Sequence, residues 1–558
     1  MKEDIQRVVS QSIENISKTL DIADLAVVVE VGIPKRKDFG DFSVNTAMVI
    51  ANKIGKKPRE VAELIIENLP VEKEQLFKKV EIAGAGFINF HVKEEAIVNK
   101  LREIEENGER FGTSDLGKGE RVLVEFVSAN PTGFLHIGHA RNAVVGDAVS
   151  RILDASGYDV VKEFYINDAG RQMNLLGESV LIRYKELFGQ NEDLPEDGYK
   201  GEYVKDIASQ IKAEKGDSLL EDSPEQASEY CKEFAEAVLL DEIKKDLADI
   251  NIFFDEWYSE KENIHGAVEE SDGSKLDQIK DLLNSKGVLE QREGALWFKA
   301  TEFGDAQDWV LIKSDGSPTY FLADIAYHYD KFKRGFKSII NVWGADHHGH
   351  VSRLKAALIS LGLDASRFSV VLIQFVRLMR QGKEVAMSKR AGTYVTMRDV
   401  VDEVGSDVTR FFLLMRSSES HLDFDLDLAK KESSENPVYY IQYAHARIRS
   451  IFRKASETDI VESKEHLELL KAPEEIELVK KLLLFPEVVE DSAQARAPHK
   501  VAYYLQEVAS EFHVYYNKCR VVDGDRQMSG ARLYLISCVQ TVLSNGLKLL
   551  GISAPERM

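Results

Sequence analysis

The sequence predicts an α/β fold, in which a central domain with a doubly wound parallel sheet lies between an N-terminal α+β module and a C-terminal all-α helical bundle. Apolar strand-like runs alternate with helical patterns in the central part, which favours parallel strands joined by helices. Strand patterns then stop, and only helical periodicity continues. A chain of 558 residues can hold three separate cores. We expect domains at residues 1–115, 116–425 and 426–558, with an insertion at about 190–300.

The N-terminal module combines two helical stretches with one alternating stretch. Residues 5–20 and 58–68 have helical periodicity, and a proline in the first turn suits the second of them. Residues 80–92 alternate apolar and small side chains around a glycine-rich bend, which predicts strands. Phe87 and Asn89 could hold an unstacked RNA base with an aromatic face and an amide. The alternative is that the phenylalanines of this stretch simply fill the core.

The stretch from residue 121 to residue 153 has the pattern of a strand, a turn and a helix. Residues 121–129 are mostly apolar, an Asn-Pro-Thr-Gly turn follows, and helical spacing begins near Gly138. This order of elements aims backbone N–H groups and the positive helix end at a phosphate. His136 and His139 could donate hydrogen bonds to phosphate oxygens as their charge grows. The alternative is a pair of helix-capping histidines on an ordinary turn.

Short apolar runs predict the other strands of the central domain. They cover residues 160–166, 338–343 and 368–376, with further β-like pieces at 295–300 and 309–313. Because ligands of open α/β sheets bind at the carboxyl ends of the strands, we expect the site at that edge.

Acidic and phenolic side chains stand near the same edge. Glu125 ends the first strand, and Tyr320 and Asp324 follow the β-like piece at 309–313. Carboxylates grip a planar guanidinium through paired hydrogen bonds, but they suit a lysine almost as well. The chemistry alone therefore predicts a cationic substrate.

The segment Asp-His-His-Gly-His at residues 346–350 has residue types that bind zinc or iron. Adjacent histidines on a strand point to opposite faces, and no Glu-x-x-His or cysteine partner lies nearby. We therefore expect no protein-bound metal, and interpret this strand end as a loop beside a nucleotide.

A polar loop bounded by glycines covers residues 382–392. Such a loop can bring Lys389 onto a leaving pyrophosphate as the transition state forms. The alternative is a solvated basic loop.

The predicted bundle begins with a basic helix at about residues 441–454, with Arg447 among its basic residues. Such a helix on an acidic protein is a candidate RNA-facing surface, although basic faces are more often merely solvated. The net charge of −22 counts against a protein that coats nucleic acid nonspecifically.

Three widely spaced cysteines indicate neither a disulfide framework nor a zinc knuckle and suit a reducing cytoplasm. No apolar run approaches a membrane span, and the start of the chain lacks the apolar core of a signal peptide.

Two of these segments resemble the signatures of class I aminoacyl-tRNA synthetases. His136-Ile137-Gly138-His139 after a Pro-Thr-Gly turn is similar to the first signature. The loop at 382–392 is similar to the second, Lys-Met-Ser-Lys-Ser, although Ala386 replaces its first lysine and Arg390 its last serine. Lys389 keeps the second lysine, and whether Lys383 or Arg390 compensates for the missing one is open.

The resemblance extends to the arginyl-tRNA synthetases, members of the same class with a Rossmann-type catalytic domain. The supporting strings run in order along the chain: VEFVSANPTGFLHIGHARNAVVGD, YINDAGRQ, YFLADIAYH, WGADHHGH, NPVYYIQYAHARI and the terminal APERM. The resemblance implies ligation of L-arginine to tRNA(Arg) with ATP and Mg²⁺, tRNA elbow contact by the first module, anticodon contact by the bundle, and a cytoplasmic monomer.

The resemblance also assigns roles to residues by position. His136, His139 and Lys389 are the expected catalytic residues. The expected ATP-binding set is His136, Gly138, His139, Gly344, Asp346, His347, Met387, Ser388 and Lys389. The expected arginine-binding set is Glu125, Asn130, Tyr320 and Asp324. The expected tRNA-binding set is Phe87, Asn89, Arg447, Tyr515, Asn517 and Met558. For the last three, the alternative is bundle core or a frayed terminus.

Two other functions fit parts of the pattern. A different ligase of the same superfamily would keep the ATP chemistry but should lack the Tyr320/Asp324 pair or the helical tail, and both are present. A non-catalytic RNA-binding relative is supported only by the missing loop lysine and opposed by His136, His139 and Lys389.

Overall fold

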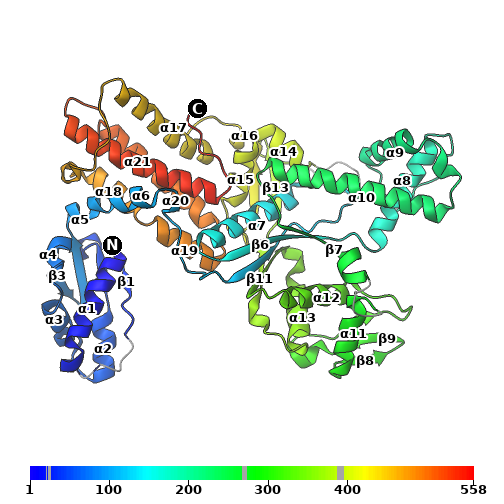
Figure 1. Cartoon of the computed structure of the whole chain (residues 1–558), viewed down its shortest axis with the longest axis horizontal. Coiled ribbons are helices and arrows are strands. Elements are labelled where there is room, and N and C mark those ends of the chain that lie inside the picture. The colour runs from blue at the N-terminus through cyan, green and yellow to red at the C-terminus, as the bar shows by residue number, and fades with distance from the viewer. Residues whose placement is uncertain (21, 23–26, 35, 267–272, 386–394) are drawn as a thin grey trace.

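A computed structural model describes residues 1–20, 22, 27–34, 36–266, 273–385 and 395–558. The N-terminal module, the central sheet with its two excursions and the helical bundle form separate lobes of an elongated molecule (Figure 1). Among the described residues, no helix is long and apolar enough to cross a membrane.

The central sheet confirms the predicted doubly wound parallel architecture. Its strand order is β12-β11-β5-β6-β7, and all four pairings are parallel. The strands are β5 (Arg121–Glu125), β6 (Asp159–Ile166), β7 (Glu256–Ser259), β11 (Ser338–Gly344) and β12 (Phe368–Ile373). From β5 the chain proceeds outward to β6 and β7 on one side, and later to β11 and β12 on the other. The carboxyl ends of β5 and β11 thus form the topological switch point, where such sheets bind ligands.

Helix α7 (Ile137–Ala155) follows β5 and packs against the sheet and the C-terminal helices. Most of its residues are buried, including the charged Arg141 and Asp147. A Cβ at Gly146 would lie 2.2 Å from Cγ of Phe126, which is why only glycine allows this close approach of helix and strand. The helix predicted to begin near Gly138 is confirmed.

The chain leaves the sheet twice where the sequence indicates one insertion. The first excursion, α8 (Arg171–Glu186), α9 (Glu202–Lys215) and α10 (Pro224–Asp249), has its own apolar core. The second comprises α11 (Lys275–Ser285) and an antiparallel sheet of β8 (Leu289–Arg292), β9 (Ala295–Phe298) and β10 (Trp309–Ile312), which pack with α12 (Tyr320–Lys333) and α13 (His348–Ser360). Between them lies β7, an edge strand of the central sheet, so the range 190–300 is not one insertion. Periodicity predicts that a short run is a strand but not which sheet it joins.

The strand predicted at residues 368–376 is divided. It ends at Ile373, and β13 (Val376–Arg380) belongs to a small sheet with β14 (Lys383–Glu384) and β15 (Leu422–Asp425). The buried guanidinium of Arg141 on α7 fixes the break by donating to the carbonyls of Gln374 (2.8 Å), Ser420 (2.8 Å) and Ser417 (2.9 Å). Burial lowers the pKa of Arg141 to about 10.

The N-terminal module is an α+β unit, as predicted. Its antiparallel sheet has the order β1-β2-β4-β3. The elements are α1 (Lys2–Leu20), β1 (Val31–Gly32), β2 (Phe42–Val44), α2 (Thr46–Ile54), α3 (Pro58–Glu67), α4 (Lys73–Leu76), β3 (Phe77–Ala83) and β4 (Phe87–Val92). Two short helices, α5 (Glu94–Asn99) and α6 (Leu101–Asn107), follow and pack on the C-terminal bundle.

The C-terminal part is helical, also as predicted. It follows α14 (Met397–Val404), α15 (Ser406–Leu414) and α16 (Leu426–Ala429). Its helices are α17 (Pro437–Ser456), α18 (Pro473–Leu482), α19 (Phe485–Ala495), α20 (His499–Lys518) and α21 (Arg526–Leu549).

A buried ion pair between α15 and α7 also ties the end of the bundle to the central domain. Arg410 on α15 lies 2.6 Å from the carboxylate of Asp147 on α7, and both side chains are 0% exposed. Arg410 also donates to the carbonyls of Leu550 (2.9 Å), just beyond α21, and Ile250 (2.7 Å), just beyond α10. Desolvation alone would raise the pKa of Asp147, but Arg410, Arg151 and Lys162 outweigh it and hold the pKa below its ordinary value.

We expect Asp147→Asn to destabilise the protein by about 3–5 kcal/mol, because it leaves the buried Arg410 guanidinium without its charge partner. Chemical denaturation followed by circular dichroism measures this. The stabilisation from a lowered carboxyl pKa is present above the unfolded-state pKa and is lost as the pH falls through the folded-state pKa. The difference between wild type and variant should therefore shrink in acid.

Arg377→Met provides the control, since its ion pair with Asp423 lies on the surface. That change should alter stability by only about 1 kcal/mol or less. Equal effects of the two substitutions would contradict the role of the buried pair.

Candidate active site at the carboxyl edge of the central sheet

A cavity of about 700 Å³ opens at the switch point of the sheet. Its walls come from the segment after β5, the start of α7, the end of β11 and the connection between β12 and β13. Seven of the residues expected from the sequence line it: Asn130, His136, Gly138, His139, Gly344, Asp346 and His347. The cavity therefore gathers most of the expected nucleotide site from segments more than 200 residues apart.

The two histidines cap the start of α7 reciprocally. Nδ1 of His136 accepts from the backbone N–H of Gly138 (3.1 Å) and His139 (3.3 Å), and Nδ1 of His139 accepts from the N–H of His136 (3.3 Å). The rings stack with their centroids 3.7 Å apart. Because each Nδ1 accepts, a neutral ring carries its proton on Nε2. The histidines are thus both helix caps and cavity-lining donors.

A strained turn precedes them. Val127 and Ser128 have φ values of 67° and 42°, a region that a β-branched side chain rarely adopts. The N–H of Val127 donates to Oδ1 of Asn142 at 2.7 Å, and Nδ2 of Asn142 donates to the carbonyl of Val342 on β11 at 2.8 Å. Asn142 therefore ties the end of β5 to β11 across the cavity floor. The sequence did not single out Asn142, because it lies off the apolar face that the helical spacing marks.

Some side chains of the segment 344–350 line the cavity, and others are buried. Asp346 and His347 line the cavity, and a Cβ at Gly344 would lie 2.4 Å from Oδ1 of Asp346, so a larger residue there would displace that side chain. His350 is instead buried, with Nε2 2.8 Å from Oδ2 of Asp324. Among the described residues no group of three His, Cys, Asp or Glu side chains could hold a metal ion.

The residues expected to hold arginine differ in exposure. Tyr320, at the first turn of α12, is 63% exposed, and the side chain of Asp324 is 33% exposed. Asn130 donates to Gln172, and both line the cavity. Glu125 is buried, and its two oxygens accept from Ser128 Oγ (2.8 Å) and Lys331 Nζ (2.5 Å). Lys389, Met387 and Ser388 lie outside the described residues.

Comparisons with known proteins agree along the whole chain. Residues 3–92 match the arginyl tRNA synthetase N terminal domain, residues 100–420 the catalytic domain of class I tRNA synthetases (R), and residues 441–558 the DALR anticodon binding domain. An arginine–tRNA ligase of Citrifermentans bemidjiense is 48% identical over 563 residues, which cover 100% of both chains. The chain belongs to the arginyl-tRNA synthetase family.

Other relatives of the arginyl-tRNA synthetase family extend the similarity. The arginine–tRNA ligase of Bacillus licheniformis is 44% identical over 560 residues, covering 100% of this chain and 99% of that protein. The solved arginyl-tRNA synthetase of Thermus thermophilus covers 100% of both chains with a TM-score of 0.75, and at 23% identity it shows a shared fold.

The residues at which the family resemblance implies tRNA contact lie in the two outer parts of the chain. Phe87 is 42% exposed on β4, whereas Asn89 on the same strand is buried. Asn517 and Met558 are exposed, and Arg447 donates to the hydroxyls of Tyr443 (3.0 Å) and Tyr516 (3.1 Å).

Tyr515 requires a correction. Its side chain is completely buried in the bundle, and burial is the main reason for its strongly raised pKa. A side chain without exposed surface does not contact RNA in this conformation. Helix geometry explains the error, because successive residues of α20 point in directions about 100° apart, so one can face the core and the next the surface. Tyr516, the next residue, is partly exposed and accepts a hydrogen bond from Arg447.

We expect Asn142→Ala to lower the rate of arginine-dependent ATP–pyrophosphate exchange by about 10–100-fold, because a shift of the strained turn moves the reacting groups. Thermal unfolding shows whether the variant still folds. The control is Asn284→Ala, an exposed change on α11 that should leave the rate unchanged. An Asn142→Ala variant with the wild-type rate would mean that the strained turn keeps its conformation without the hydrogen bonds of Asn142.

Proposed function

We propose that the protein joins L-arginine to tRNA(Arg) in two steps at the switch-point cavity, with ATP bound as its magnesium complex. The arginine carboxylate attacks the α-phosphorus of ATP, which gives arginyl-adenylate and pyrophosphate. The 3′-terminal hydroxyl of the tRNA then takes the arginyl group, and AMP leaves. The observation that carries this proposal is the reciprocal histidine cap at a helix start that lines the cavity.

Catalysis in this scheme is positioning and charge stabilisation, and no side chain acts as a nucleophile. The positive end of α7 and the Nε2–H groups of His136 and His139 face the phosphates, whose charge grows as pyrophosphate departs. Gly138 keeps the helix start open, since a Cβ there would lie 3.0 Å from Cε1 of His136. Gly344, Asp346 and His347 take the nucleotide on the opposite wall.

Lys389 is the proposed cation for the leaving pyrophosphate, with Met387 and Ser388 beside it in the signature. Support comes from the described residue Thr396, which follows this segment and forms a β-bridge with His136. The backbone N–H of the next residue, Met397, donates to the carbonyl of Leu135 at 2.7 Å. The described residues that follow the segment with Lys389 thus lie directly beside the histidine cap.

Asp324, Tyr320, Glu125 and Asn130 are proposed to hold arginine, the carboxylates at its guanidinium and the amide of Asn130 at its amino acid backbone. A guanidinium matches a carboxylate through two parallel N–H···O bonds, which an ammonium does not form. Asp324 is partly exposed and therefore open to such a ligand. Recognition of this kind makes a separate editing domain less necessary.

The outer parts of the chain are proposed to bind tRNA. Phe87 takes the elbow as the stacking surface, whereas the expected contact by Asn89 is withdrawn because its side chain is buried, and the bundle reads the anticodon through Arg447, Asn517 and Met558. We further propose a monomer in the cytoplasm, which fits its three free, buried cysteines.

We expect the protein to catalyse ATP–pyrophosphate exchange with arginine and tRNA(Arg), and Lys389→Ala to lower the rate by about 10²–10³-fold, since it removes a transition-state cation. Omitting tRNA from the same assay decides whether activation depends on it. The control is Lys313→Ala, an exposed lysine of the second excursion. No exchange by folded protein that still binds tRNA would favour the non-catalytic alternative.

We expect Phe87→Ala to raise the KM for tRNA by roughly 10-fold, because stacking of one base on an aromatic ring is worth about 1–3 kcal/mol. The KM for arginine should not change. Phe39→Ala is the matched control, since Phe39 lies in the same module and is 43% exposed. An unchanged KM for tRNA in the Phe87 variant would show that the elbow binds elsewhere.

A further inference from the structure

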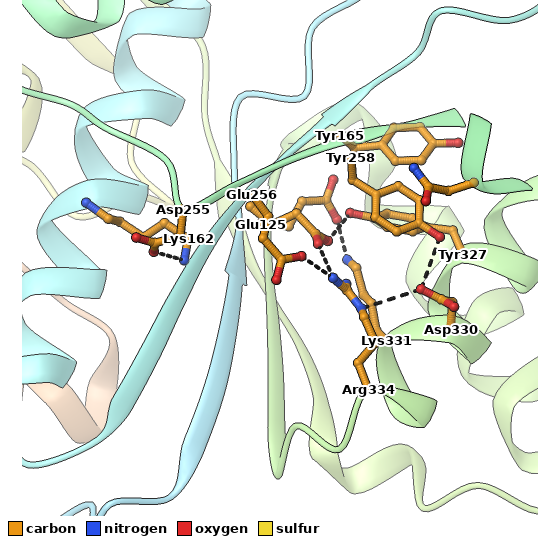
Figure 2. A network of polar contacts seen from close by, with 12 residues as sticks. Glu125, Lys162, Tyr165, Asp255, Glu256, Tyr258, Tyr327, Asp330, Lys331 and Arg334 are labelled. Carbon is orange, nitrogen blue, oxygen red and sulfur yellow. Dashed lines mark hydrogen bonds and ion pairs between the residues drawn. The ribbon is translucent and has the colours of Figure 1, made fainter. Parts of the chain in front are cut away.

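One continuous chain of hydrogen bonds joins the two carboxylate residues proposed to hold arginine. Lys331 on α12 donates to Oε2 of Glu125 on β5 at 2.5 Å and to Oδ1 of Asn341 on β11 at 3.0 Å. Nδ2 of Asn341 lies 2.9 Å from Nε2 of His328, and Nδ1 of His328 lies 2.8 Å from the carbonyl oxygen of Asp324. Figure 2 shows Lys331 extending from α12 toward Glu125.

The chain of contacts is almost entirely removed from water. Lys331 and Asn341 are 0% exposed, and His328 and Glu125 are nearly so. An ammonium buried to this degree is tolerated only with a charge partner and further hydrogen bonds. Lys331 has both, and its Nζ also lies 4.1 Å from the ring centre of Tyr327.

Lys331 determines the direction of every bond in the chain. Its ammonium can only donate, so Asn341 must turn its Oδ1 toward Lys331 and its NH₂ toward His328. Nε2 of His328 must then accept, which places the ring proton on Nδ1, where it donates to the carbonyl of Asp324. Burial, together with the charge of Lys331, holds the pKa of His328 well below its ordinary value, so the ring stays neutral.

The sequence spacing explains how one helix face carries the contacts. Asp324, His328 and Lys331 stand at positions i, i+4 and i+7 of α12 and so share a face. Asn341 is the register partner of Glu125 in the parallel pair of β11 and β5. The helix face therefore meets both central strands at the switch point.

We propose that Lys331 is a positioning residue of the arginine site, which fixes Glu125 directly and the main chain of Asp324 through Asn341 and His328. The proposal rests on the proposed function of Glu125 and Asp324. Lys331 also neutralises Glu125, whereas Asp324 lies 2.8 Å from His350 and interacts electrostatically with Arg353. Because Lys331 offsets the charge of Glu125, it contributes to specificity by setting the net charge that the two carboxylates offer to a guanidinium.

The test is the KM for arginine in ATP–pyrophosphate exchange with tRNA present. Lys331→Met keeps the length of the side chain but removes the charge, and should raise the KM for arginine by about tenfold or more while the KM for ATP stays within about twofold. Lys333→Met, an exposed lysine of the same helix, should change neither constant. A folded Lys331→Met variant with the wild-type KM for arginine would overturn the proposal.

Two further variants separate positioning from mere stabilisation. Asn341→Leu keeps the pair of Lys331 and Glu125 but breaks the link to Asp324, so it should also raise the KM for arginine. Glu125→Gln combined with Lys331→Met removes both buried charges and should recover the unfolding temperature that Lys331→Met loses, while the KM for arginine stays high. A double variant that recovers both quantities would show that neither Glu125 nor Lys331 takes part in binding arginine.

The outcomes also distinguish this proposal from the proposed function. Wild-type protein without arginine-dependent exchange would contradict the function, and this inference with it. Active wild-type protein whose Lys331 and Asn341 variants bind arginine normally would contradict the inference alone.

Discussion

The parallel pairing of β5 with β11 is the constraint on which the rest of the structure depends. Both strands end at the same edge of the sheet, and the chain order reverses between them, so the connections that follow diverge and leave a cavity there. Asn142 links these two strand ends, and the start of α7 places the histidine cap above them. The site is built where backbone topology alone brings distant segments together.

Several buried ion pairs flank this constraint, while others lie elsewhere, such as Arg532 with Glu475 in the bundle. On one side of the sheet Lys331 and Arg334 of α12 neutralise Glu125 and Glu163, which are register partners on β5 and β6 (Figure 2). On the other side Arg410 neutralises Asp147. Buried pairs add little net stability compared with apolar packing, but they fix geometry because a displaced partner leaves an unpaired charge. Positional accuracy at the switch point accounts for their placement.

The contacts of Arg410 also link the C-terminal bundle and the first excursion to the helix that borders the site. Arg410 contacts α7, the residue after α10 and the residue after α21 at once, so the bundle and the first excursion share one anchor on the helix that carries the histidine cap. Arg141, on the same helix, holds the cavity wall at Gln374. A rigid helix with anchors at several points keeps its first turn in place, which positioning catalysis requires.

The amino-acid sequence by itself determined the fold class, the family and the residues near the start of α7 that line the cavity, because hydrophobic periodicity and the signature segments are local features. It also placed Glu125, Tyr320 and Asp324 near one sheet edge. Only the tertiary structure decided that β7 belongs to the central sheet, that Tyr515 is buried, and that Glu125 is already paired with Lys331. These facts depend on contacts between residues far apart in the chain, such as the 206 positions that separate Glu125 from Lys331, and periodicity carries no information about them.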